Sequence, residues 1–162
     1  MTVLKGYLEK WKGRLYASPY TIAELYNTVY RKVAGGDLKL AEPLAEILSG
    51  LSADSLGEAV AELVLAFVVK KLSLKIIDDP DVYTGIDIHI HDVQLILPRL
   101  FHTCIELSPK TRIRIKDLLH VAYVKLLKDK YGIEYLVTCD AEDFDRVREV
   151  LKELGVQLVV IG

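Results

Sequence analysis

Four carboxylates lie close together near the carboxyl end of the chain. In residues 135–147, YLVTCDAEDFDRV, an apolar run is followed within six residues by Asp140, Glu142, Asp143 and Asp145. One aspartate after a strand is ordinary, because turns favour it. Four acids in one place repel one another, so either solvent or a metal cation must make the arrangement tolerable. Carboxylate oxygens are the ligands that Mg²⁺ and Mn²⁺ prefer.

Two acids from distant parts of the sequence are expected at the same place. Asp117 lies in the first turns of a predicted helix, 114–132, that leads into the strand before Asp140. Glu24 lies one to two turns into a predicted helix that follows a short strand, 14–17. In an open parallel sheet, ligands bind at the carboxyl ends of the strands, and a helix that leads into a strand begins near that end. We therefore expect Glu24, Asp117 and Asp140 to converge at one rim of a sheet.

Each acid also has a purely structural explanation. Asp117 can cap its helix, and Glu24 and Asp143 can offset the dipoles of theirs. The predicted convergence favours the alternative, in which a divalent cation sits among the carboxylates. Such an ion lowers the pKa of a bound water and stabilises the charge of a phosphate in the transition state. The arrangement is therefore suited to chemistry on a phosphate group.

The elements that position these acids alternate along the chain. The periodicity and the Gly, Pro and Ser signals predict helices over 2–12, 18–36, 38–50, 55–72, 84–107, 114–132 and 143–154, and strands over 14–17, 73–78, 134–138 and 156–161. The helix 55–72 is apolar on most sides and is expected to be buried. Apolar strands that alternate with helices indicate a parallel sheet covered on both faces, so we predict one α/β domain over residues 1–162.

The composition limits the class of protein. The 162 residues are 51% hydrophobic and carry a net charge of −2, which argues against disorder and gives no overall basic surface for nucleic acid. Two cysteines are too few for a disulfide framework and favour a reduced, cytoplasmic setting. The longest apolar run, 63–69, is far short of the ~20 residues of a membrane span, and residues 1–11 do not read as a signal peptide. Scarce Asn and Gln beside abundant Lys and Glu suit a thermophile.

Three segments carry a resemblance to a known family. SPYTIAELYNTVYR at 18–31, IKDLLHVAY at 115–123 and YLVTCDAEDFDRV at 135–147 resemble, in order and rough separation, blocks of the PIN-domain family. Its members are compact nucleases similar to the 5′-exonuclease fold. Many are toxin ribonucleases of toxin–antitoxin pairs, and others act in RNA processing. The resemblance implies a three-layer α/β/α fold with a mostly parallel sheet.

The resemblance also implies roles for the acids. It assigns Glu24, Asp117 and Asp140 as ligands of Mg²⁺ or Mn²⁺, directly or through water, and Asp143 as a supporting catalytic acid. The activity it implies is metal-dependent endoribonuclease, with RNA as the substrate and an antitoxin as a possible partner protein.

The sequence departs from the family pattern at its start. The family opens on a central strand that ends in a metal-binding Asp, whereas residues 1–4 begin where the next helix of the family begins. Two explanations stand open: a truncated start, or a degenerate member that keeps the fold as a binding or assembly protein. A sheet without that strand has unpaired edges and leaves the apolar residues of 2–11 partly uncovered, so we also predict at least a dimer, with this helix near the contact.

Other chemistry-bearing residues have weaker support. On a strand, His89 and His91 would share a face with Asp87. In the helix predicted for this segment, the two histidines would instead point about 200° apart, which argues against a shared metal site. The basic run KTRIRIK, 110–116, is either a phosphate contact beside the acids or a solvated turn. Cys139 lacks a neighbouring partner for catalysis and is expected to be an ordinary thiol. A small-molecule phosphate-handling protein is a third possibility, disfavoured because no Gly-rich phosphate loop is present.

Overall fold

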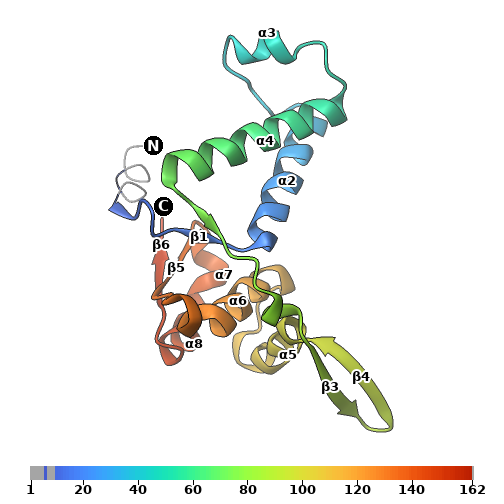
Figure 1. Ribbon diagram of the computed structural model, residues 1–162, viewed down its shortest axis with the longest axis vertical. Helices are drawn as coiled ribbons and strands as arrows, with labels where there is room; N and C mark the ends of the chain where they lie inside the picture. Colours follow the sequence, from blue (N-terminus) through green and yellow to red (C-terminus); the bar gives the residue numbers. More distant parts are fainter. Residues whose placement is uncertain (1–5, 7–9, 162) are drawn as a thin grey trace. The chain divides into compact units, whose positions relative to one another are not determined.

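The computed structural model describes residues 6 and 10–161 and has mixed α/β structure in which helices predominate (Figure 1). This confirms the α/β class predicted from the sequence. The chain divides into two compact units, Met1–Ile77 and Asp78–Gly162, which we term the N-terminal and C-terminal units. The single domain predicted over the whole chain stays a prediction. No helix in the described part of the chain is long and apolar enough to cross a membrane.

From residue 16 onward, the N-terminal unit contains three helices and one short parallel strand pair. Its elements are β1 (Tyr16–Ala17), α2 (Pro19–Ala34), α3 (Leu44–Leu48), α4 (Ala53–Leu72) and β2 (Lys75–Ile76), with β1 parallel to β2. The N-terminus of α2 forms as predicted, because the Ser18 hydroxyl accepts a hydrogen bond from the Thr21 amide at 3.1 Å. The helix predicted over 2–12, and the dimer contact predicted there, lie mostly outside the described residues.

Helices α2 and α4 pack through a small apolar core. Val29 of α2 and Val60 and Ala61 of α4 are buried in it. Gly57 lets the two helices approach closely, because a Cβ at that position would lie 2.8 Å from the ring of Tyr30.

The prediction that α4 is buried is wrong. Only Gly57, Val60 and Ala61 of this helix are buried, and Leu63 and Phe67 are 48% and 65% exposed. The sequence is apolar around most of the helix, but α2, the main element packed on it in the described part of the chain, covers only one face.

The C-terminal unit is built around a long helix. Its elements are the 3₁₀ helix η1 (Pro80–Tyr83), β3 (Gly85–Ile90), β4 (Val93–Pro98), α5 (Arg99–Thr111), α6 (Ile115–Tyr131), β5 (Tyr135–Thr138), α7 (Ala141–Asp145), α8 (Arg148–Glu153) and β6 (Gln157–Val160). Helix α6 packs on α5 and ends at Gly132, whose φ of 63° places it in the left-handed region. Strands β5 and β6 pair in parallel, as two consecutive apolar strands joined by helices predict.

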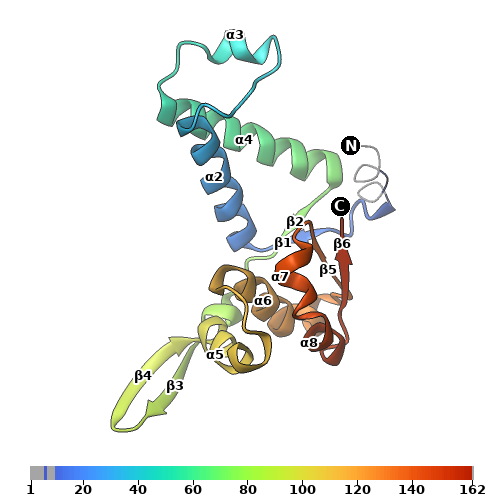
Figure 2. The ribbon, with the colours of Figure 1, turned by 180° about the vertical axis from the view of Figure 1, so that it is seen from behind.

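The long helix predicted over 84–107 is wrong in its first half. Residues 85–98 form an antiparallel hairpin, β3–β4, with a two-residue loop at His91 and Asp92, and only α5 is helical (Figure 2). The apolar residues at 86, 88, 90, 93, 95 and 97 fit the two-residue period of a strand on each side of that loop. The alternation and the turn therefore outweigh the helical stripe that the sequence also allows.

The helix predicted over 143–154 is divided. Helix α7 ends at Asp145 and α8 begins at Arg148, with the buried Val147 between them. The break lets both Phe144 and Leu151 reach the core, since both are buried.

The described strands pair in three separate two-stranded sheets, of which two are parallel and one is antiparallel.

A buried carboxylate ties η1 to the end of α6. Asp79 is 1% exposed, and its Oδ2 accepts hydrogen bonds from Lys130 Nζ at 2.7 Å and from the Tyr131 hydroxyl at 2.8 Å. Its Oδ1 accepts from the Asp81 amide at 3.0 Å, and Lys130 also contacts Asp81. The hydrogen bond from Lys130 is the main reason that the pKa of Asp79 is below its usual value, while burial opposes the shift.

We predict that Asp79→Asn lowers the melting temperature at pH 7, because the amide has no negative charge to pair with Lys130 and keeps only one of the two acceptor oxygens that Asp79 uses. A carboxyl whose folded pKa is depressed stabilises the fold above its unfolded pKa of about 3.9 and loses that contribution as the pH falls through the folded value. The difference between wild type and variant should therefore narrow below about pH 4, measured by circular dichroism at several pH values. Asp81→Asn, which changes an exposed partner of the same lysine, is the control and should cost less. A difference that is constant with pH would contradict the prediction.

Candidate functional site

An ion pair links the start of α6 to the first turn of α7. Arg114, at the N-cap position of α6, forms an ion pair with Asp143 in the first turn of α7, with 3.8 Å between Nε and Oδ2. Arg114 stands three residues before Asp117, and Asp140 stands three residues before Asp143. The pair therefore brings together the two segments of the C-terminal unit that carry predicted site residues.

Asp117 is buried without full satisfaction of its carboxylate. It is 4% exposed, and its Oδ1 lies 3.4 Å from Lys116 Nζ. Its Oδ2 is buried and has no hydrogen-bond partner. Such an atom carries a desolvation cost, and in native proteins it is uncommon enough to need an explanation. The position in the first helical turn favours negative charge, but it does not satisfy that oxygen.

Asp140 has a defined orientation at the end of β5. Its amide donates a hydrogen bond to Thr138 Oγ1 at 3.0 Å, and its Oδ1 accepts from the Asp143 amide at 3.2 Å. Asp140 is thus the N-cap of α7. Its side chain is exposed, so it is accessible to a ligand from solvent.

Local partners account for much of the acidic cluster. Asp143 pairs with Arg114, and Asp145 pairs with Arg148. Glu142 lies in the first turn of α7 and is exposed to solvent, where the helix dipole favours an acid. Solvent, helix termini and arginines therefore make the concentration of charge tolerable without requiring a cation. Asp117 is the exception, because one of its oxygens is both buried and unpartnered.

The donor chemistry of the site partly fits a hard cation. Among the described residues, no group of three His, Cys, Asp or Glu side chains is assembled to hold a metal ion. The C-terminal unit offers Asp117 and Asp140 as oxygen donors, and the unpartnered Oδ2 is an atom that a cation would satisfy. Glu24 belongs to α2 of the N-terminal unit, and its predicted place in the ligand set stays a prediction.

The basic run 110–116 contacts acids of its own unit. Besides the Arg114 and Lys116 contacts, Lys110 lies 3.7 Å from Glu153. The sequence left open whether this run contacts phosphate beside the acids or forms a solvated turn, and it did not predict the ion pairs of Arg114 and Lys116 with the candidate acids. The available signal for these ion pairs was the position of the basic residues at the start of α6, because residues there lie close to Asp117 in the same first turn.

The remaining sequence candidates do not form a site in the described structure. His89 lies on β3 on the same face as Asp87, but His91 is in the loop with a φ of 52° and does not continue the alternation. Cys104 is buried and Cys139 is exposed, and both are free thiols. His120 is half-buried in α6.

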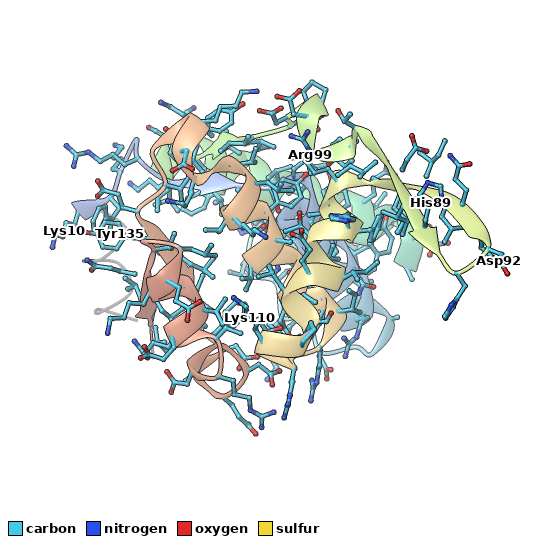
Figure 3. All side chains as sticks on the ribbon, turned by 90° about the horizontal axis from the view of Figure 1, so that it is seen from below. Lys10, His89, Asp92, Arg99, Lys110 and Tyr135 are labelled. Atoms are coloured by element: carbon cyan, nitrogen blue, oxygen red, sulfur yellow. The ribbon has the colours of Figure 1, made fainter. Side chains whose placement is uncertain are left out.

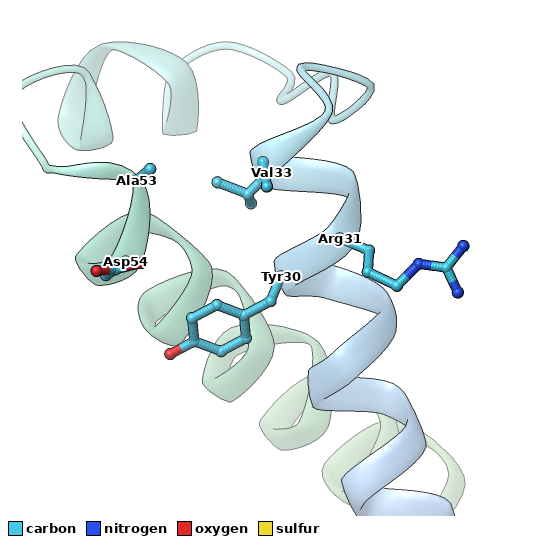
Figure 4. Close-up of a pocket in the computed structure, with 6 residues that line it drawn as sticks. Tyr30, Arg31, Val33, Ala53 and Asp54 are labelled. Carbon is cyan, nitrogen blue, oxygen red and sulfur yellow. The ribbon is translucent and has the colours of Figure 1, made fainter.

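One shallow pocket lies elsewhere, in the N-terminal unit. It is about 240 Å³ in volume and is formed at the end of α2 and the start of α4. Tyr30 and Val33 face it, and Arg31 points away from it (Figure 4). Its lining is mainly apolar and brings no set of polar groups together, so it does not indicate a catalytic centre.

We predict that Asp117→Asn raises the free energy of unfolding by about 1 kcal/mol in metal-free buffer, because a neutral amide reduces the desolvation cost of the unpartnered oxygen. The lost pair with the half-exposed Lys116 offsets only part of this gain. Denaturant unfolding gives the measurement. Asp145→Asn is the matched control and should change the value by less than about 0.5 kcal/mol. A clear loss of stability in Asp117→Asn would mean that the carboxylate is structural.

Comparison of the chain with protein-family models, with curated proteins and with solved structures finds no match. Its function is therefore argued from the geometry above and from the residues that resemble the PIN-domain blocks.

Proposed function

We propose that the chain is a metal-dependent endoribonuclease of PIN type, with a three-layer α/β/α arrangement around a mostly parallel sheet. The observation that carries the proposal is the buried Asp117, whose Oδ2 lacks a partner in the first turn of α6, where Arg114 pairs with Asp143 of α7. A catalytic carboxylate is commonly kept in such an unfavourable state, because its ligand completes its interactions.

Each residue of the site has a separate role in this proposal. Asp117 and Asp140 supply carboxylate oxygens for Mg²⁺ or Mn²⁺, and Glu24 is the third ligand expected from the sequence. When bound, the ion would supply an activated water and offset charge on the phosphate. Asp143 holds the first turn of α7 through its amide contact with Asp140. Arg114, whose side chain is 74% exposed, is available to contact the RNA backbone.

A catalytically degenerate binding or assembly protein is the second candidate. The observation that favours it is that protein cations already occupy two of the acids, since Arg114 pairs with Asp143 and Lys116 with Asp117. In an active site these pairs would have to open or share the acids with a metal ion.

Cleavage of RNA tests the proposed activity. A labelled single-stranded RNA should be cut in Mg²⁺ or Mn²⁺ and left intact in EDTA. Asp117→Asn and Asp140→Asn should each lower the rate at least about 100-fold, because each removes a predicted metal ligand. Glu24→Gln should do the same if its predicted role holds. Asp92→Asn, in the hairpin loop, is the control and should keep the wild-type rate.

Metal binding separates the two candidates. Mn²⁺ should raise the melting temperature of the wild type by preferential binding to the folded chain, and Asp117→Asn should abolish that rise. Binding without cleavage would favour a degenerate member that retains its metal site. Absence of both would contradict the nuclease and leave the binding or assembly protein.

A further inference from the structure

The β3–β4 hairpin extends away from the helices of its own unit (Figures 1 and 2). Its six residue pairs run from Gly85–Pro98 to Ile90–Val93, and the Arg99 amide donates to the Thr84 carbonyl at its base. In the described part of the chain, neither strand pairs with any other strand on its outer edge. An isolated two-stranded hairpin is marginally stable in water, and a free edge invites another strand.

The hairpin has one aliphatic and one polar face. Residues directly opposite each other share a face, so one face carries the aliphatic side chains of Ile86, Ile88, Val93, Leu95 and Leu97. The other face is mainly polar and carries Asp87 and His89 on β3 and Gln94 on β4, together with the 71% exposed Ile96 opposite Asp87. Gln94 Nε2 lies 3.4 Å from Asp87 Oδ1. Val93 on the aliphatic face is 54% exposed. The ribbon is thus amphipathic and is incompletely covered by its own unit.

The sequence of β3 is complementary to itself in the antiparallel direction. Residues 86–90 read Ile-Asp-Ile-His-Ile. When two such strands pair about a two-fold axis at Ile88, each Asp87 stands opposite a His89 and each Ile86 opposite an Ile90. The polar face then contains two Asp–His pairs, in which an imidazole N–H can donate to a carboxylate, and the other face contains three aliphatic pairs.

We propose that two copies of this chain associate by antiparallel pairing of their β3 strands about Ile88, which joins the two hairpins into a four-stranded sheet. The complementarity of Asp87 and His89 points to a second copy as the occupant of this edge. An unrelated strand would match both the charges and the aliphatic positions only by coincidence. The inference is independent of the proposed nuclease activity.

Strand β4 is a poorer edge for the same purpose. Self-pairing of β4 about Leu95 would set Gln94 opposite the aliphatic Ile96, which gives no polar partner. Pro98 also lacks a backbone N–H and cannot donate to an added strand. The geometry therefore selects β3, and pairing through one edge only limits the assembly to a dimer.

Exchange of the two polar residues tests the register. By sedimentation velocity over a micromolar concentration range, the wild type should form a dimer. His89→Asp should weaken dimerisation about tenfold or more, because each of two Asp–His pairs becomes a pair of like charges. The double variant Asp87→His with His89→Asp restores complementarity and should restore the dimer.

The matched control is His91→Asp. It makes the same change in charge in the hairpin loop, where aspartate tolerates a positive φ and the opposing residue of the second copy is Gly85. Figure 3 shows His89 partway along the hairpin and Asp92 at its loop. His91→Asp should leave the dimer unchanged. Circular dichroism should show that all variants keep the wild-type fold.

Cysteine cross-linking gives a second, geometric test in a Cys139→Ser background. Ile88→Cys should form an intermolecular disulfide on mild oxidation, since directly opposed strand residues lie within disulfide range. Ile86→Cys should not, because its equivalents would be four residues, or roughly 13 Å, apart along the strands. A monomeric wild type, equal dimerisation of His89→Asp, failure of the double variant to recover, or equal cross-linking at both positions would each overturn the proposal.

Discussion

Burial of helix α6 constrains the C-terminal unit more than any other feature. Eight of its 17 residues are buried. One is Asp117, and the other seven are hydrophobic: Leu118, Leu119, Val121, Ala122, Tyr123, Val124 and Leu127. A helix buried over so much of its length fixes what lies at its two ends. Its first turn is thereby held beside α7, and its last turn is held against η1.

A buried carboxylate lies at each end of α6, and the two differ in how well their oxygens are hydrogen-bonded. At the C-terminal end, Asp79 receives hydrogen bonds from Lys130, Tyr131 and a backbone amide, so its charge is satisfied and contributes to stability. At the N-terminal end, Asp117 keeps an oxygen without a partner. Burial of charge is tolerated when it is paired and costly when it is not. This contrast between the two ends of α6 separates a structural acid from a candidate ligand better than acidity or sequence position does.

Local signals in the sequence predicted the elements that local physics determines. The Ser18 cap of α2 and the Gly132 end of α6 both follow from short-range hydrogen bonding and backbone freedom. The exposure of Phe67 and the burial of Asp117 depend on which elements pack together, and no local pattern contains that information. The Arg114–Asp143 pair is of the same kind, since its residues are far apart in sequence.

The hairpin shows why one pattern allowed two predictions. Aliphatic residues at 86, 90, 93, 97 and 100 fit a helical stripe, while those at 86, 88, 90, 93, 95 and 97 fit two strands joined by a short loop. The polar residues between them distinguish the alternatives, because Asp87, His89 and Gln94 share one face only in the hairpin. A helix would keep Asp87 and Gln94 on one face, since they are seven residues apart, but would place His89 about 200° away from Asp87. The alternation of Asp87 and His89 with isoleucines is the pattern of a strand, and it also makes the edge of β3 self-complementary. The strand that the helical prediction missed is therefore the element through which we propose that a second copy pairs.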